Sequence, residues 1–460
     1  MRRGLLGARG LLLAAVAGVT ACTMIPHYER PAAPVAAAYP NAPAPQAGAA
    51  AAEIAWRDVF GDEQLKSLVE LALANNRDLR TAVLKVEQLQ AQYRVTRANS
   101  FPQVDANAAF ARENIGPITT SQWTANVGIT AYEIDLFGRV RSLNAQALEQ
   151  YLATAEAQRS EQISLVASVA TQYFTLRETQ EQVKLARETL DAVQESYRLN
   201  KVSFDAGQIN ELDLRTAEGQ VQNARINLLT YERALAQARN GLEVLLGAPL
   251  PSQLPAARDF DDPALVAQVP AGLPSDLVAR RPDILEAEHT LKSANANVGA
   301  ARAAFFPRIT LTGSVGRSST ELSRLFDAGN GSWTFLPQLS VPLFAGGANR
   351  ANLDVAKVEE RIEVAQYEKA IQTAFREVAD ALVAASSYST QVDIESAAIE
   401  TQRRRYELAD ARYRQGDDTY LNVLSAQQDL YNAQQGRIQA RFNGLASQIA
   451  LYQALGGGWK

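Results

Sequence analysis

The sequence is poor in the residues that carry metal, redox and hydrolytic chemistry. Its 460 residues include one cysteine, two histidines and two methionines. A single cysteine excludes a disulfide within the chain and a zinc site built from several thiolates. Two histidines and no glycine-rich phosphate loop after a strand leave no arrangement typical of an enzyme. We therefore expect no catalytic residues, no cofactor and no metal site.

The chain also lacks an excess of positive charge and lacks long apolar runs. It has 45 basic and 50 acidic residues and a net charge of −5, which gives nucleic acid nothing to bind. After the first 21 residues no run of 18 apolar residues occurs, so a membrane protein built from apolar spanning helices is not expected.

The first residues are typical of an export signal. Residues 1–21 begin with Arg2 and Arg3 and continue with an apolar core, which predicts a secretory signal peptide. The stretch ending in Cys22 resembles a bacterial lipoprotein signal, in which the cysteine is acylated, with palmitate among its acyl chains. An ordinary signal peptide with an incidental cysteine is the alternative. Thr23, where an aspartate would favour the inner membrane, favours the outer membrane.

The middle of the chain contains a long stretch without proline, from Gly138 to Phe204. As a helix it would be about 100 Å long. Apolar residues recur in it every seven positions, which is typical of a seam between packed helices. The seam comprises Val169, Leu176, Val183, Leu190, Tyr197 and Phe204. It recurs in the same phase as Val378, Ala385, Val392, Ile399, Tyr406 and Tyr413. The sequence therefore predicts a duplicated unit of long helical hairpins.

Two regions change from a helical period to an alternation of apolar and polar residues. We expect strand pairs at about residues 102–132 and 307–343, of the length that crosses a bilayer when tilted. Pro337 and Pro342 predict that the last strand is kinked or frayed. One face of the strands is polar and would line a lumen. Its members are Asp105, Asn107, Asn126, Thr310 and Thr312.

These patterns divide the chain into five parts. Residues 1–21 are the signal peptide, and 22–55 are the lipidated N-terminus with an extended tether rich in proline and alanine. Residues 56–249 form a first repeat of helix, strand pair and long helical hairpin. Residues 250–272 are a linker, and 273–460 form the second repeat.

Four strands of one chain cannot close a membrane barrel, because open edges are not tolerated in hydrocarbon. Three chains would supply twelve strands and leave a water-filled lumen, whereas eight strands would be nearly filled by side chains. We therefore predict a mixed α and β fold: a trimeric 12-strand outer-membrane β-barrel, continuous with a long periplasmic α-helical barrel. A solid coiled-coil rod is the alternative, but it leaves the strand pairs unexplained.

Three segments resemble the outer-membrane factors of Gram-negative efflux systems, the TolC-like family, and most closely its lipoprotein branch typified by OprM. They are the run from Cys22 to Pro31, the segment from Leu273 to Ile284 containing Arg280-Arg281-Pro282-Asp283, and the terminal run from Leu455 to Trp459. The resemblance covers almost the whole chain. It implies a homotrimeric, passive exit duct that is lipid-anchored in the outer membrane and extends into the periplasm.

The resemblance also implies site residues at the periplasmic tip. The family's constriction leucine falls on Leu421, and its acidic ring positions fall on Asn422 and Ser425, which carry no charge. Cation selectivity is therefore not carried over. Asp213 matches a family residue that latches neighbouring helices, and Asp417 and Asp418 could supply charge at the tip or belong to a solvated turn. Leu421 is expected to close the tip by apolar packing.

The partners implied are a periplasmic adaptor, an inner-membrane resistance-nodulation-division transporter and outer-membrane lipid. The expected cargo is drugs or other small toxic compounds. A periplasmic adaptor, also lipidated and hairpin-containing, is an alternative identity, and a type I secretion or metal-efflux duct is an alternative role. The sequence does not identify the substrate.

Overall fold

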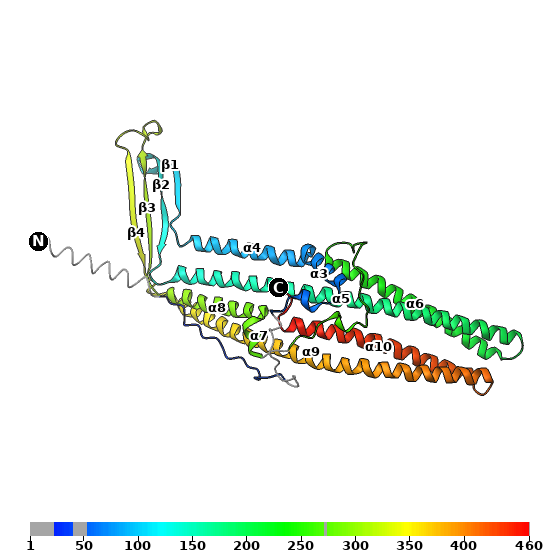
Figure 1. Ribbon diagram of the computed structural model, residues 1–460. Coiled ribbons are helices and arrows are strands. Elements are labelled where there is room, and N and C mark those ends of the chain that lie inside the picture. The colour runs from blue at the N-terminus through cyan, green and yellow to red at the C-terminus, as the bar shows by residue number, and fades with distance from the viewer. Residues whose placement is uncertain (1–22, 40–52, 271–273, 460) are drawn as a thin grey trace. The chain divides into compact units, whose positions relative to one another are not determined.

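The computed structural model describes residues 23–39, 53–270 and 274–459. Cys22 lies outside these residues, so its acylation stays a prediction. Figure 1 labels most of the elements. In chain order they are α2 (Trp56–Val59), α3 (Glu63–Asn75), α4 (Arg77–Ala98), β1 (Val104–Ile115), β2 (Ile118–Ile134), α5 (Arg139–Asp205), α6 (Glu211–Leu246), η2 (Pro263–Leu265), α7 (Pro274–Arg280), α8 (Pro282–Ala303), β3 (Arg308–Ser319), η3 (Leu322–Arg324), β4 (Gly331–Ser340), α9 (Ala348–Gln415) and α10 (Tyr420–Ala454).

The chain forms two compact units, and each takes segments from both halves of the sequence. Unit 1 comprises Met1–Ala32, Leu84–Glu156 and Leu285–Lys369, and it contains β1, β2, β3 and β4. Unit 2 comprises Ala33–Val83, Ala157–Ile284 and Ala370–Lys460. The order helix, helix, strand, strand, long helix, long helix occurs twice, from α3 to α6 and from α7 to α10.

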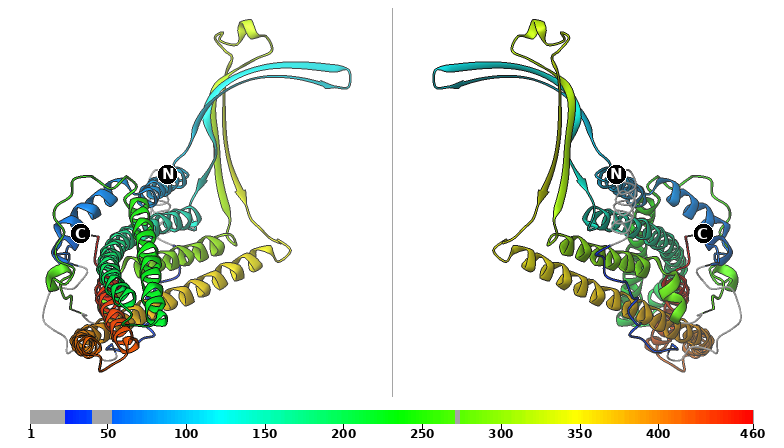
Figure 2. Two further views of the ribbon diagram at one scale, coloured as in Figure 1. Left: turned by 90° about the vertical axis from the view of Figure 1, so that its right-hand side faces the viewer. Right: turned by 90° about the vertical axis from the view of Figure 1, so that its left-hand side faces the viewer.

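The strands of unit 1 form one antiparallel sheet in the order β1-β2-β3-β4. β1 pairs with β2 along its whole length, whereas β3 pairs with β2 only from Trp123 onward. The remaining part of the β1–β2 hairpin curves away from β3 and β4 (Figure 2). A bulge between Ile129 and Tyr132 shifts the register of β2 against β3. The alternation of the sequence therefore predicted the strands, but it missed the extension of β1 to Ile115.

The predicted fraying of the last strand is wrong for the part of it that contains Pro337. β4 passes through this proline, which sits opposite Leu311 in an unbroken register. The reason is that, within the described residues of the single chain, β4 has β3 as its one strand neighbour, so the missing N–H of proline can face away from β3. Pro342 lies beyond the end of β4.

The helices begin and end where the local chemistry predicts. The Asn210 side chain accepts a hydrogen bond from the Asp213 N–H at 2.9 Å and starts α6. Gly247 ends α6 in the left-handed conformation, with φ of 64°. A Cβ at Gly247 would lie 2.5 Å from the Asn75 carbonyl oxygen, so glycine is required there. Across the described residues, none of the helices carries an apolar stretch of the length that a membrane crossing needs.

The largest core of unit 2 joins α3, α5, α6 and α10. Its fully buried large side chains include Trp56, Phe60, Tyr173, Phe174 and Tyr452. The carboxylate of Asp62 is also fully buried there and accepts hydrogen bonds from the Tyr173 hydroxyl at 2.8 Å and the Arg258 N–H at 3.1 Å. This core holds together the ends of both long hairpins that lie away from their turns.

The N-terminal segment of unit 1 packs along α8. Glu288 of α8 is 2% exposed and receives hydrogen bonds from the Tyr28 hydroxyl at 3.2 Å and from the Arg30 guanidinium at 2.7 and 3.1 Å. Lys292 contacts the same carboxylate at 3.0 Å. Ile25 lies so close to Gly299 that a Cβ there would approach it to 2.7 Å. The residues directly after Cys22 are therefore fastened to α8.

Candidate functional site

The five predicted lumen residues share one face of the sheet. Asn107 of β1 pairs directly with Asn126 of β2, and Asp105 pairs with Gly128. Gly128 pairs with Ser314 of β3, two residues from Thr312 and four from Thr310, so both threonines have the parity of that face. The Thr312 hydroxyl also accepts a hydrogen bond from the Ala131 N–H at 3.1 Å, within the bulge.

The opposite face of the sheet is apolar, and its rows run in register over all four strands. In one row Ala106, Val127, Val315 and Trp333 stand side by side. Its apolar members are Val104, Ala106, Ala108, Phe110, Trp123, Ala125, Val127, Ile129, Ile309, Leu311, Val315, Trp333, Phe335 and Leu339. Trp333, Phe335 and Val315 are among the most exposed large apolar side chains. The sheet thus has one polar and one apolar face.

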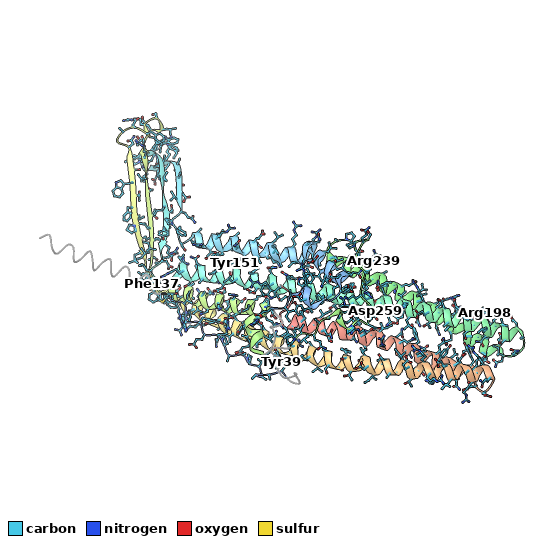
Figure 3. The ribbon with its side chains drawn as sticks, in the orientation of Figure 1. Tyr39, Phe137, Tyr151, Arg198, Arg239 and Asp259 are labelled. Carbon is cyan, nitrogen blue, oxygen red and sulfur yellow. The ribbon has the colours of Figure 1, made fainter. Side chains whose placement is uncertain are left out.

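The foot of the sheet is held by stacking and ion pairs that the sequence did not reveal. The ring of Phe137, labelled in Figure 3, stacks on Phe306 with centroids 4.8 Å apart. The Glu133 carboxylate forms ion pairs with the Arg139 guanidinium and with the Arg308 guanidinium, each at 2.7 Å. A cavity of about 260 Å³ lies beside these residues. Glu133 and Arg139 are six residues apart in the sequence, but Arg308 comes from the other half of the chain. A local sequence pattern therefore could not predict the cluster.

At the turn of the α9–α10 hairpin, Leu421 is 69% exposed in the single chain. The side-chain amide of Asn422 donates a hydrogen bond to Asp418 at 2.5 Å, and Arg405 donates one to the Ser425 hydroxyl at 3.2 Å. The hydrogen bond from Asn422, together with the Thr419 N–H, lowers the pKa of the Asp418 carboxyl. Both residues at the predicted acidic ring positions are thus neutral hydrogen-bonding groups.

The acidic residues predicted for the tip differ in their surroundings. Asp418 forms an ion pair with Arg412 at 3.5 Å, and the Asp417 N–H donates a hydrogen bond to the Arg412 carbonyl at 3.0 Å. Asp213 lies in the first turn of α6. Burial raises the pKa of Tyr413, and the charge of Asp213 raises it further. The structure therefore places Asp213 near the second hairpin and Asp418 at the turn of that hairpin.

Tyr413 and Tyr420 join the two hairpins of one chain through contacts that the sequence did not predict. The Tyr413 hydroxyl donates to the Asn200 side-chain oxygen at 3.0 Å, and the Tyr420 hydroxyl lies 2.9 Å from the Ser196 hydroxyl. Tyr420 also belongs to a small apolar cluster with Ala217, Val423 and Leu424. Tyr413 stands in the predicted heptad seam, and the occurrence of tyrosine there is the signal that could have indicated a hydrogen bond.

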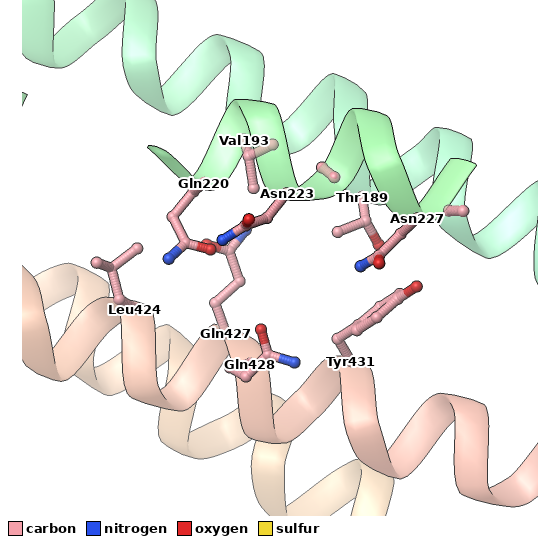
Figure 4. A pocket seen from close by; sticks show the side chains of 11 residues that line it. Thr189, Val193, Gln220, Asn223, Asn227, Leu424, Gln427, Gln428 and Tyr431 are labelled. Atoms are coloured by element: carbon pink, nitrogen blue, oxygen red, sulfur yellow. The ribbon is translucent and has the colours of Figure 1, made fainter. Parts of the chain in front are cut away.

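Next to this cluster, and farther from the turns, the two hairpins line an uncharged polar cavity of about 40 Å³, which is large enough for one or two waters. Figure 4 shows amide side chains from α6 and α10 facing into it. They are Gln220, Asn223, Asn227, Gln427 and Gln428. Tyr431 closes one end, and burial raises its pKa to about 12. A neutral amide lining suits water between the helices rather than bond-making chemistry.

The segment Arg280-Arg281-Pro282-Asp283 has a structural role. Arg281 is 7% exposed and contacts Asp283 at 2.6 Å, Glu377 at 2.8 Å and the Ala454 carbonyl at 2.7 Å. Arg280 forms an ion pair with Glu53. Both arginines therefore form structural ion pairs. In the part of the chain that the structure describes, no group of three or more His, Cys, Asp or Glu side chains could hold a metal ion.

Comparison with known proteins identifies the class. The model of the family described as outer membrane efflux protein matches residues 68–248 and 273–457. A probable efflux pump outer membrane protein, TtgC of Pseudomonas putida, is 47% identical over 95% of this chain and 93% of its own length. The outer membrane protein OprJ of Pseudomonas aeruginosa is 42% identical over 100% of this chain and 97% of its own.

Solved structures of outer-membrane channels are also similar to this chain. The open state of the MtrE outer membrane channel of Neisseria gonorrhoeae has a TM-score of 0.89 and 39% identity, covering 95% of this chain and 99% of that one. CusC has a TM-score of 0.87 and 38% identity, covering 95% and 100%. The fold is that of an outer-membrane channel with strands and long helices. The chain belongs to the outer membrane efflux protein family, and it is an outer-membrane transport component that extends into the periplasm.

Proposed function

We propose that three copies of the chain form one conduit, with a 12-strand barrel in the outer membrane and a tube of twelve long helices in the periplasm. Each chain contributes two structural repeats, residues 56–249 and 273–460, joined by 250–272. The observation that carries the proposal is the sheet, which has a polar and an apolar face in continuous register. Within the described residues, β1 and β4 each have only one strand neighbour. Pairing between chains would satisfy both edges.

In this assembly Asp105, Asn107, Asn126, Thr310 and Thr312 line the barrel lumen. An acylated Cys22 anchors each chain, and residues 22–55 lead from the anchor to the body. Several acyl chains would hold the N-terminus firmly, because each buried methylene contributes about 0.8 kcal/mol. The fastening of Arg30 to Glu288 supports a fixed path along α8 for the residues that directly precede Arg30.

The conduit is an exit duct for drugs or other small toxic compounds, delivered by an inner-membrane resistance-nodulation-division transporter through a periplasmic adaptor. Relatives named for toluene and for antibiotic efflux pumps support this cargo class. Membership of the efflux family decides against the adaptor alternative. Type I protein secretion and metal efflux are alternative roles. The susceptibility profile of a deletion strain distinguishes the three cargoes, which are small toxic compounds, secreted proteins and metal ions.

At the periplasmic tip, Leu421 forms an apolar constriction, flanked by the neutral Asn422 and Ser425. Asp213, Asp417 and Asp418 hold neighbouring helices at the closed tip. The exposure of Leu421 in the single chain, beside neutral neighbours, supports closure by apolar packing rather than by a charged ring.

The test is conductance in planar bilayers. We expect the wild-type protein to give small, mostly closed channels and Leu421→Ser to raise the mean conductance several-fold. Leu212→Ser is the matched control, because Leu212 is similarly exposed, 74%, at the start of α6. Conductance that stays at the wild-type value in Leu421→Ser would reject the constriction, and absence of any channel from the wild type would reject the conduit.

A further inference from the structure

The connection between β3 and β4 is an ordered loop that contains a short helical turn, η3 (Figure 2). The Ser318 N–H donates to the Asn330 carbonyl at 3.0 Å and closes the base of the loop. The Asn330 N–H donates to the Asp327 carbonyl at 3.4 Å. These bonds fix the backbone of the loop, so its side chains have defined positions.

The loop buries one apolar side chain and exposes two. Leu325 is 5% exposed, whereas Leu322 is 55% and Phe326 is 72% exposed. Arg324 and Asp327 lie beside them, with an ion pair of 3.7 Å between them. A loop that exposes a phenylalanine and a leucine next to charged groups has the amphipathic composition of an interfacial segment.

The register of the sheet determines on which side the loop lies. Arg317 of β3 pairs with Ala125 and Gly331, and it has the same parity as Val315, so it belongs to the apolar face. Its guanidinium donates hydrogen bonds to the carbonyl oxygens of Phe326 at 3.0 Å and Asp327 at 2.7 Å. The loop is therefore tied to the apolar side of the sheet, not to the polar side.

We propose that the β3–β4 loop is a lipid-contact element, with Phe326 and Leu322 inserted into the acyl layer of the outer leaflet and Arg324 and Asp327 at its polar boundary. The inference rests on the proposed barrel, in which the apolar face meets lipid. The loop continues that face beyond the ends of the strands. Insertion of Phe326 would remove an exposed aromatic side chain from water, which is favourable.

Spin labelling of the full-length protein in reconstituted bilayers tests the proposal. A nitroxide is attached to Phe326→Cys, and its collision rates with dissolved oxygen, which concentrates in the acyl layer, and with a water-soluble nickel chelate are compared. Trp333→Cys is the reference for the apolar face, and Ser332→Cys on the same strand is the reference for the polar face. We expect the oxygen-to-nickel ratio at Phe326 to match that at Trp333 and to exceed that at Ser332 several-fold.

The references separate the possible failures. A ratio at Phe326 equal to that at Ser332, with Trp333 still high, would overturn the loop proposal and leave the barrel intact. Low collision rates with both reagents at Phe326 would mean that a second copy of the chain covers the loop, which also overturns it. A low ratio at Trp333 itself would instead reject the barrel. Leu322→Cys repeats the measurement if Phe326→Cys is not recovered. Arg317→Gln should lower the ratio at Phe326 by releasing the loop.

Discussion

At the scale of single residues, the carboxylate of Glu288 governs how the N-terminal segment is held. Burial alone would raise the pKa of this carboxyl, but hydrogen bonds from Lys292 and Arg30 outweigh burial and hold the pKa below its ordinary value. Tyr28 donates to the same carboxylate, and burial raises the pKa of its phenol, so it stays protonated. One buried anion thus binds two cations and a phenol.

Because the pKa of Glu288 is lowered by folding, its stabilising contribution is complete above the ordinary carboxyl pKa of about 4.3 and is lost as the pH falls through the lowered value. We expect Glu288→Gln to destabilise the protein by about 1–2 kcal/mol at pH 7. The difference between variant and wild type should shrink below pH 4. Thermal unfolding followed by circular dichroism measures it. Glu87→Gln, on the exposed face of α4, should change nothing at either pH, and an equal loss in both variants would contradict the prediction.

Ala131 is a residue whose backbone conformation does not suit its side chain. Its φ is 52°, in the left-handed region, within the bulge of β2. Ala131→Gly should remove this strain and stabilise the folded protein by up to about 1 kcal/mol, whereas Ala131→Val should destabilise it by about 1–2 kcal/mol. Ala125→Gly, in the regular part of the same strand, should be destabilising. Denaturation in detergent compares the three, and a destabilised Ala131→Gly would be the contrary result.

The sequence patterns predicted the long helices and the strands, but not the contacts between residues that are far apart in the chain. The heptad seam predicted the long helices because their packing repeats along the chain, and alternation predicted the strands because one face of the sheet is apolar. From Ala111 to Asn114 the residues are mostly polar, so the alternation ends while the pairing of β1 continues. Contacts such as Arg30 with Glu288 join residues far apart in the sequence and leave no periodic signal. Pro337 was misjudged because the sequence does not say which strand lies at the edge.

At the scale of elements, the turn ends of the two hairpins are joined by few contacts. The Tyr413–Asn200 and Tyr420–Ser196 hydrogen bonds and one small apolar cluster lie there, and the water-sized amide cavity follows. The opposite ends share a large apolar core. Loss of a few hydrogen bonds would therefore free the turn ends while the core keeps the hairpins attached.

The double variant Tyr413→Phe, Tyr420→Phe should weaken the join between hairpins by about 2 kcal/mol in total, since each neutral hydrogen bond contributes about 1 kcal/mol. We expect a higher open probability in planar bilayers with little change in thermal stability. Tyr406→Phe, in the same cluster, is the control, because its ring packs there and, among the residues that the structure describes, no hydrogen bond to its hydroxyl joins the hairpins. An open probability equal to that of the wild type would show that the tyrosines do not hold the tip closed.

At the scale of the whole molecule, the proposed assembly explains why one face of the sheet is polar and the other is apolar. A chain alone leaves β1 and β4 as edge strands and exposes Trp333 and Phe335. In the proposed assembly, three chains would pair these edges, place the apolar face against lipid and surround a water-filled lumen with the polar face. Assembly and membrane insertion are therefore expected to depend on one face of the strands and to tolerate change on the other.

Neighbouring residues in the middle of β4 test this expectation. Phe335 pairs with Gly313 on the apolar face, and Thr334 pairs with Ser314 on the polar face. Phe335→Lys places a charge toward lipid and should cost about 2–4 kcal/mol near the midplane, so little heat-labile trimer should be recovered from the outer membrane. Thr334→Lys should assemble normally and shift the channel toward anions, because its charge enters the water-filled lumen. Electrophoresis of unheated membrane extracts and reversal potentials in a salt gradient give the two readouts. Equal recovery of both variants would show that the apolar face does not meet lipid, and the three-chain barrel would have to be abandoned.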